Sequence, residues 1–323
     1  MKKMIEFVNV TKRFSRSSRP VVKNLNLTIY EGEIVVFIGP SGCGKTSTLK
    51  MINRLIEPTE GKILLDGKDI SELNPLTLRQ NIGYVIQNIG LFPHMTVEEN
   101  IAVVPKMKKW PKEKIRQRVT ELLELVGLDP DTYRRRSPQQ LSGGQQQRVG
   151  IARALAADPP IMLMDEPFGA LDPITRERLQ NEFLKIQRRV KKTIVFVTHD
   201  INEAVKMGDK IVIMRDGEII QHDTSEAILS APADQFIANL IGEDRAIKFL
   251  SLVPISRLLT DEVPPLPPKT EIPSIPPDGT LKDGLNRMLE NNVTELAVVD
   301  ANRKVLGRIT MNQIVAMAMH TNK

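Results

Sequence analysis

The sequence has little of three features that mark particular classes of protein. It contains one cysteine, Cys43, so no disulfide can form within the chain and a reducing compartment is expected. Aromatic residues make up only 4% of the chain, which argues against stacking platforms for single-stranded nucleic acid. No apolar run approaches the roughly 18 to 20 residues that a membrane-spanning helix needs. Glu6 and Asn9 interrupt the apolar residues near the N-terminus, so no secretory signal is expected there.

Length and charge are those of a globular protein with more than one domain. A chain of 323 residues is long enough for two domains, and its apolar fraction of 41% is sufficient to bury a core. The formal net charge is +6 at pH 7. Scattered surface lysines explain such a charge, and a basic face toward anionic lipid or nucleic acid is the alternative.

Short buried-strand patterns alternate with amphipathic helices through most of the chain. Residues 112–128 form one such helix, with its apolar residues on a single face. Strands that alternate with helices predict an α/β fold with a mostly parallel sheet covered on both faces. Residues 4–33 instead alternate with period two, which favours an antiparallel subdomain. The expected buried strands are residues 33–38, 160–166, 192–200 and 209–214.

The composition changes after about residue 250. Seven prolines between residues 264 and 277 predict a semi-rigid extended linker, because proline sustains neither a helix nor a central strand. We therefore predict three parts: a first domain at 1–245, a Pro-rich linker at 246–271, and a small α/β unit at 272–323. A unit of about 50 residues is marginal for an independent core, so we expect it to pair with something.

A phosphate-binding loop follows the first buried strand. Residues 39–46, GPSGCGKT, fit the pattern G-x-x-x-x-G-K-[ST] between a strand and a helix, whereas a chance Gly-rich turn is the alternative. Glycines let the backbone fold around phosphates, Lys45 reaches the outer phosphates, and Thr46 supplies a hydroxyl to Mg²⁺. For Cys43, a redox role is the alternative to a backbone contact. The predicted nucleotide-binding residues are Gly39, Pro40, Ser41, Gly42, Cys43, Gly44, Lys45, Thr46 and Ser47.

Two later strands end in groups that suit phosphoryl chemistry. The strand at 160–166 delivers Asp165 and Glu166 at its carboxyl end, where open α/β sheets bind ligands. A surface turn could also explain this pair, but after a phosphate-binding loop we assign Asp165 to Mg²⁺ and Glu166 to the attacking water. The strand at 192–200 ends near His199, which we predict to be catalytic with Glu166 and Lys45, although a lone histidine is often structural.

Together with LSGGQ at residues 141–145, these motifs closely resemble the nucleotide-binding subunit of ABC transporters, over about residues 4–245. The resemblance implies a P-loop ATPase with a RecA-like core, an antiparallel β subdomain and a helical subdomain that carries LSGGQ. By the same resemblance, Phe14 stacks on adenine, Gln87 is the Q-loop glutamine and a Mg²⁺ ligand with Thr46 and Asp165, Asp172 belongs to the D-loop, and His199 is the switch histidine.

The resemblance also gives LSGGQ a partner. It implies that two copies meet head to tail, with each ATP between the phosphate-binding loop of one copy and the signature of the other. For the residues alone, an ordinary Ser-Gly helix start is the alternative reading, since a helix N-terminus attracts anions without further chemistry. The implied signature contacts to ATP are Ser142, Gly143, Gly144 and Gln145.

A narrower resemblance is to bacterial importers of quaternary amines such as glycine betaine, choline and carnitine. It is carried by KMINRLIEPTEGKI, GYVIQNIGLFPHMTVEENI, PKMKKWP and MDEPFGALDPITR, together with the tail. It implies a peripheral subunit at the cytoplasmic face of the membrane, an integral membrane permease, an extracytoplasmic substrate-binding protein and no nucleic acid partner. The substrate pocket is then not in this chain.

The tail from about residue 272 resembles a single CBS motif, so the two copies of the dimer are expected to pair their motifs. The family's nucleotide-binding pattern ends in an aspartate where this chain has Gln313, which puts nucleotide binding in doubt. A dimer clamp and a sensor of ionic strength, membrane surface or a cyclic dinucleotide both stay open. For the whole chain, the alternatives are a soluble ABC ATPase acting on nucleic acid or ribosomes, and an importer of another small solute.

Overall fold

The structure is a computed structural model that describes all residues except 16–18, 88–89, 170, 260–271 and 320–323. The chain divides into two compact units, Met1–His222 and Asp223–Lys323. The predicted first domain ended at residue 245, whereas the helices from residue 225 onward group with the second unit. The reason is packing, because helix α11 (Arg245–Leu250) contacts both α9 (Ser225–Ser230) and α13 (Met311–Met319). Residues 246–250, at the start of the predicted linker, are thus helical, and the prolines at 264–268 lie outside the described residues.

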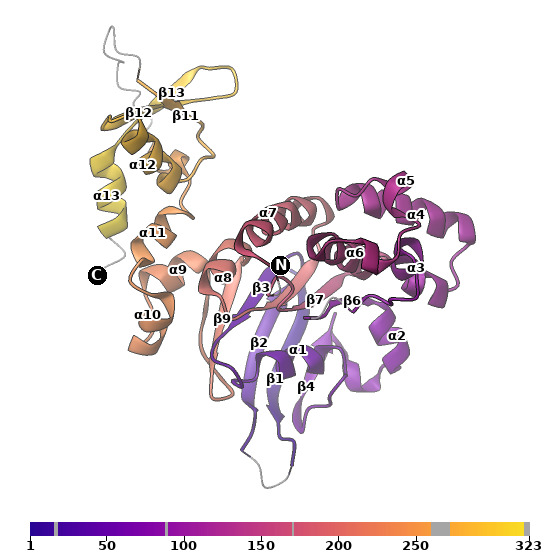
Figure 1. Ribbon diagram of the computed structural model, residues 1–323. Helices are drawn as coiled ribbons and strands as arrows, with labels where there is room; N and C mark the ends of the chain where they lie inside the picture. Colours follow the sequence, from indigo (N-terminus) through magenta and orange to yellow (C-terminus); the bar gives the residue numbers. More distant parts are fainter. Residues whose placement is uncertain (16–18, 88–89, 170, 260–271, 320–323) are drawn as a thin grey trace. The chain divides into compact units, whose positions relative to one another are not determined.

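A six-stranded sheet with the order β10-β9-β3-β8-β7-β6 forms the base of the first unit (Figure 1). The pairings of β3 with β8 and β9, and of β7 with β6 and β8, are parallel, as the alternation of strands and helices predicts. Every residue of β3, β7 and β8 is buried. The strands are β3 (Ile34–Ile38), β6 (Ile82–Val85), β7 (Ile161–Asp165), β8 (Thr193–Val197), β9 (Lys210–Arg215) and β10 (Glu218–Asp223).

A second sheet, with the order β2-β1-β4-β5, is the antiparallel subdomain that the period-two pattern predicts. Helix α1 (Lys45–Ile52) shares one apolar core with both sheets, because Leu49 clusters with Ile5 of β1 and with Val195 of β8. This packing fixes the helix that starts at the phosphate-binding loop. The strands are β1 (Lys3–Lys12), β2 (Val22–Tyr30), β4 (Glu60–Leu65) and β5 (Lys68–Asp69).

The other helices of this unit cover the large sheet or form a helical subdomain. Figure 1 shows α3, α4, α5 and α6 grouped together, and α6 contacts β6. The apolar face predicted for the helix at 112–128 is buried as expected, at Ile115, Val119, Leu122, Leu123 and Val126. The helices are α2 (Pro75–Gln80), α3 (Val97–Met107), α4 (Lys112–Leu125), α5 (Pro130–Tyr133), α6 (Gly143–Leu155), α7 (Pro173–Val190) and α8 (Ile201–Met207), with 3-10 turns at Ile70–Glu72 and Pro138–Gln140.

The second unit is a small α/β fold, as the tail pattern predicts. Its three-stranded sheet has the order β11-β12-β13, with β12 and β13 antiparallel. Within the described ranges, no helix of either unit is long and apolar enough to cross a bilayer. The elements are α9 (Ser225–Ser230), α10 (Gln235–Ile241), α11, a 3-10 turn (Ile255–Leu258), β11 (Ser274–Ile275), α12 (Leu281–Glu290), β12 (Glu295–Val299), β13 (Val305–Thr310) and α13 (Met311–Met319).

Candidate nucleotide site

The phosphate-binding loop connects β3 to α1 and depends on its glycines. Gly39, Gly42 and Gly44 have φ angles of 151°, 80° and 108°, a region that side chains with a Cβ rarely adopt. A Cβ on Gly39 would also lie 2.1 Å from the carbonyl oxygen of Met214, and one on Gly44 would lie 2.5 Å from that of Val21. The loop therefore needs glycine at both ends for steric as well as conformational reasons.

Lys45 opens helix α1 and folds back over the loop. Its Nζ donates hydrogen bonds to the carbonyl oxygens of Gly39 and Pro40, at 2.7 and 2.9 Å, and lies 3.7 Å from Sγ of Cys43. The side chain is only 7% exposed. Gly44, the N-cap residue, has no side chain to satisfy the first N–H groups of the helix. The loop thus combines a buried cation with an uncapped helix start, which is an arrangement suited to phosphates.

Thr46 and Asp165 meet at the carboxyl ends of β3 and β7. Thr46 Oγ1 donates a hydrogen bond of 2.9 Å to Asp165 Oδ1. Burial raises the pKa of the Asp165 carboxyl group, and the hydrogen bond from Thr46 opposes that shift. Mg²⁺ usually takes only one or two ligands from the protein, and substrate phosphates and water supply the rest. One hydroxyl and one carboxylate match that number. In the part of the chain that the structure describes, no three His, Cys, Asp or Glu side chains gather as a metal cage. The residues present therefore fit Mg²⁺ brought with a nucleotide.

Glu166, Gln87 and His199 converge on one point, as their predicted roles require. Glu166 Oε2 accepts a hydrogen bond of 3.1 Å from Gln87 Nε2 and lies 3.3 Å from His199 Nδ1. The three residues come from the segments that follow β6, β7 and β8. Gln87 presents its amide N–H to Glu166, so its Oε1 is the end available to a cation.

The backbone at Glu166 is strained. Its φ is 44°, in the left-handed region that a residue with a Cβ adopts only at a cost. The hydrogen bond from Glu166 N to the carbonyl oxygen of Val197, at 2.9 Å, holds this conformation against β8. The turn directs the carboxylate away from the strand and toward His199. No sequence signal predicts this strain.

The signature segment forms a capped helix start. Ser142 Oγ accepts a hydrogen bond of 3.3 Å from Gln145 N, and Gln145 Oε1 accepts one of 2.9 Å from Ser142 N. This reciprocal pair is a capping box. Gln145 Nε2 also donates to the Tyr133 hydroxyl at 3.0 Å. The four predicted signature residues thus lie at the N-terminus of α6, as expected.

A cavity of about 360 Å³ opens at this helix start. Among the described residues, none from the phosphate-binding loop lines it. Within one copy, the structure therefore does not join the two predicted halves of the ATP site. The residues around the cavity are Gly127, Leu128, Tyr133, Ser142, Gly143, Gly144, Gln145, Arg148, Leu171, Asp172, Thr175 and Arg178.

Two other predicted nucleotide contacts have local partners. Asp172 caps α7, because its Oδ1 accepts a hydrogen bond of 3.0 Å from Thr175 N, and the bonds from Thr175 lower the pKa of this carboxyl group. Phe14 is 64% exposed, with Lys12 Nζ 5.3 Å from the centre of its ring, so the ring is available for stacking. Residue 170 of the D-loop lies outside the described residues.

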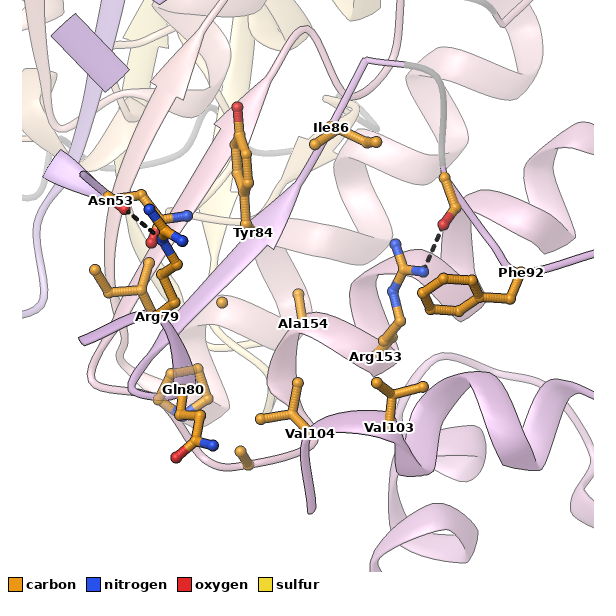
Figure 2. A pocket seen from close by; sticks show the side chains of 15 residues that line it. Asn53, Arg79, Gln80, Tyr84, Ile86, Phe92, Val103, Val104, Arg153 and Ala154 are labelled. Atoms are coloured by element: carbon orange, nitrogen blue, oxygen red, sulfur yellow. Dashed lines mark hydrogen bonds between the residues drawn. The ribbon is translucent and has the colours of Figure 1, made fainter. Parts of the chain in front are cut away.

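A groove that the sequence did not predict lies beside the Q-loop segment (Figure 2). It has a volume of about 310 Å³ and lies between β6, α3 and the end of α6. Ile86 and Phe92, on either side of the Q-loop residues, are 37% and 40% exposed. Arg153 donates a hydrogen bond of 2.6 Å to the carbonyl oxygen of Gly90 and lies over the Phe92 ring. Apolar residues on both sides of Gln87, Ile86 and Phe92, are the signal that could have found this groove.

Comparisons with known proteins agree with the motifs. The ABC transporter family model matches residues 22–169, and the CBS domain family model matches residues 262–319. The osmoprotectant import ATP-binding protein OsmV of Salmonella typhimurium is 49% identical over 307 residues, which cover 94% of this chain and 78% of that protein. The glycine betaine/carnitine/choline transport ATP-binding protein OpuCA of Bacillus subtilis is 50% identical over 311 residues, which cover 96% of this chain and 79% of that protein.

A solved structure shares the fold of the first unit. It is the dimeric post-hydrolysis state of the ATP-binding cassette MJ0796 bound to ADP and Pi, with 39% sequence identity and a TM-score of 0.61. The match covers 69% of this chain and 99% of that chain. The resemblance predicted from the motifs is confirmed for the ATPase and for the CBS tail. The chain belongs to the ABC transporter family, as an ATP-binding subunit with a C-terminal CBS domain.

Proposed function

We propose that this chain is the ATP-hydrolysing subunit of an importer for glycine betaine, choline, carnitine or a related quaternary amine. The observation that carries the substrate class is the extent of the similarity. Relatives named for these solutes match about half of the residues over 96% of the chain, so the likeness includes the tail as well as the cassette. The pocket for the solute then belongs to an extracytoplasmic binding protein.

The working unit is a pair of copies that closes on two ATP molecules. Among the described residues of one copy, none from the phosphate-binding loop lines the signature cavity, which supports a site completed by the signature of a second copy. Ser142, Gly143 and Gly144 would then offer a hydroxyl and the positive end of α6 to the nucleotide of the partner. Each ATP contacts both copies only in the closed pair, so it binds the closed pair more tightly than the open one and favours closure.

Hydrolysis follows from the residues that converge at the strand ends. Glu166 accepts the proton of the attacking water, and His199 holds the γ-phosphate and that water, while Lys45 neutralises charge on the outer phosphates. Thr46, Asp165 and Gln87 would hold Mg²⁺, which supplies further neutralisation of the phosphate oxygens. After cleavage the bridging phosphate chain is lost and the pair opens.

The groove beside the Q-loop supports a membrane permease as the partner. Its exposed Ile86 and Phe92 form an apolar surface, and both lie within a few residues of Gln87. A short segment of the permease in this groove would therefore move with the residue that contacts Glu166. This contact would couple closure of the ATPase pair to the transport path.

The tail is proposed to pair with the tail of the second copy. Leu289 of α12 and Val315 and Met319 of α13 are 63%, 45% and 66% exposed, so this small unit leaves apolar side chains at its surface. Gln313 is engaged in a capping box, because its Oε1 accepts hydrogen bonds from N and Oγ1 of Thr310 at 2.8 and 3.1 Å. The side chain at the family's aspartate position is thus committed to the start of α13, which favours a dimer clamp over a nucleotide site. Size-exclusion chromatography with and without residues 265–323 tests this, and unchanged association would contradict it.

The experiment for the substrate class is uptake of labelled glycine betaine, choline and carnitine in cells with and without the gene. We expect uptake of at least one solute to require the gene. A Glu166→Gln gene is the matched control, since it supplies the protein without its hydrolysis. Uptake that is unchanged for every solute, or copurification with nucleic acid in place of membrane protein, would overturn the proposal.

A further inference from the structure

A second polar cluster lies immediately after β8 and is not part of the proposed chemistry. It joins the segment that carries His199 to helix α7. Glu203 and Gln180 are each 5% exposed, and Thr198 is 2% exposed. Burying a carboxyl group and an amide costs free energy unless both are hydrogen-bonded. The hydrogen bonds within this cluster therefore decide whether its burial is tolerated.

The carboxylate of Glu203 ties α7 to the residue before His199. Glu203 Oε1 accepts a hydrogen bond of 2.9 Å from Gln180 Nε2 of α7, and the side chain of Thr198 acts to lower the pKa of the same carboxyl group. Thr198 Oγ1 in turn accepts a bond of 3.1 Å from Asp200 N. His199 lies between Thr198 and Asp200, so both of its chain neighbours are fixed by this cluster. Burial raises the pKa of Glu203, although Thr198 and Gln180 both act to lower it.

Arg176 extends the cluster to the D-loop. Its Nη1 lies 3.7 Å from Asp200 Oδ2, and its Nη2 donates a hydrogen bond of 3.1 Å to the carbonyl oxygen of Leu171. The Nε of Arg176 is a buried donor without a partner in the described structure. The guanidinium group thus spans from the residue after His199 to the loop before α7, and one of its donors is still unsatisfied.

A role in stability alone explains this cluster poorly. Replacing buried polar and ionic groups with well-packed apolar residues is often neutral or stabilising. Apolar side chains could therefore join α7 to α8 equally well. Directional hydrogen bonds do something that apolar packing does not, because they fix the orientation of the groups that they connect. The group whose orientation matters here is the imidazole of His199, which lies 3.3 Å from Glu166 Oε2.

We propose that Glu203 is a positioning residue for His199, and that Arg176 connects this positioning cluster to the D-loop. The imidazole then keeps its place beside Glu166 only while α7 and the segment after β8 are joined. A movement of the D-loop that reaches α7 would be passed to His199 through the same contacts. This inference rests on the proposed role of His199 in hydrolysis.

The test compares two glutamines of α7 in the complete transporter. Gln180→Ala removes the bond to Glu203, whereas Gln187→Ala is the matched control. Gln187 is 7% exposed on the same helix, and its Nε2 donates to the carbonyl oxygen of Lys192, away from His199. We expect Gln180→Ala and Glu203→Ala to lower kcat by about tenfold, as small misplacements of a reacting group do. KM for ATP should stay within about twofold, and Gln187→Ala should leave kcat unchanged.

A second comparison separates positioning from structure. Glu203→Gln keeps an acceptor oxygen, so it should recover most of the rate that Glu203→Ala loses. In a His199→Ala background, Glu203→Ala should cause no further loss of kcat, because the positioned group is gone. Full activity in Gln180→Ala and Glu203→Ala, or losses that multiply in the double variant, would overturn the inference. A wild-type complex that fails to hydrolyse ATP would instead overturn the proposed function.

Discussion

Two glycine-containing turns in this protein lead into helices, yet they are built differently. The loop at 39–44 has three glycines at positive φ and ends at Gly44, which offers α1 no side-chain cap. The turn before α6 has Ser142 as a cap, held reciprocally by Gln145. Neither Gly143 nor Gly144 has a positive φ. In the first turn, the N–H groups that begin α1 have no side-chain acceptor, so a ligand must supply one. In the second turn, the side chain of Ser142 already caps the start of α6.

This difference fits the proposal that the two turns serve one nucleotide from opposite sides. A loop with unsatisfied N–H groups and a buried lysine binds phosphates strongly by itself. A capped helix end with small residues offers a close approach but few free donors, so it contributes once the nucleotide is already held. A Cβ on Gly143 would have no contact closer than 3.8 Å, which is consistent with an open surface. The first turn should therefore control binding, and the second should control closure and hydrolysis.

The largest expected effect comes from replacing Glu166, which is proposed to lie between the two turns in the closed pair. Glu166→Gln should lower the hydrolysis rate by about 10² to 10⁴, since it removes the general base. ATP binding should persist, so both turns stay engaged and the pair stays closed. ATPase assays and size-exclusion chromatography with ATP measure the two effects. Wild-type turnover in this variant would show that Glu166 is not the base.

Lys45→Ala should impair phosphate binding by the first turn and leave the second turn unchanged. We expect ATP affinity to fall by about 10- to 100-fold, because one charge-assisted contact to the phosphates is lost. ATP should also no longer raise the melting temperature of the protein, whereas it should still do so for Ser142→Ala. Titration with a fluorescent nucleotide compares the two variants. Equal losses of affinity would contradict the assignment of binding to the first turn.

Mixing the two variants sharpens the comparison further. Lys45→Ala and Ser142→Ala should each be inactive as pure pairs, because every composite site contains a damaged half. A mixed pair contains one intact site, made of the normal loop of one copy and the normal signature of the other. Activity should therefore return in the mixture, up to that of one site. No recovery at any ratio, with mixed pairs demonstrated by tags, would contradict a head-to-tail arrangement.

The smallest expected effect concerns stability without nucleotide. Ser142→Ala should lower the free energy of unfolding by about 1 kcal/mol, because it removes the N-cap of α6. Ser41→Ala is the matched control in the other turn, where serine caps no helix, and should change stability by less than about 0.5 kcal/mol. Denaturant titration of the first transition compares them. An equal loss in both variants would remove the distinction between the turns.

The sequence predicted those features of the fold and the site that depend on a few consecutive residues. The buried strands, the apolar face of α4 and the loop from Gly39 to Thr46 follow from patterns of a few residues, and the structure has all of them. The partner of the signature came from the resemblance, since Ser142 and its neighbours describe only a helix start. The domain border near residue 222 and the bond between Glu203 and Gln180 depend on packing between distant segments. No short pattern carries that information.

The left-handed backbone at Glu166 sets fold stability against activity at a single position. Glycine would adopt a φ of 44° without steric cost, whereas a residue with a Cβ loses roughly 1 kcal/mol there. Glu166→Gly should therefore relieve conformational strain while it removes the carboxylate from His199. Screens that select only for thermostability would favour such a change and inactivate the enzyme. At this residue, stability and turnover are competing properties.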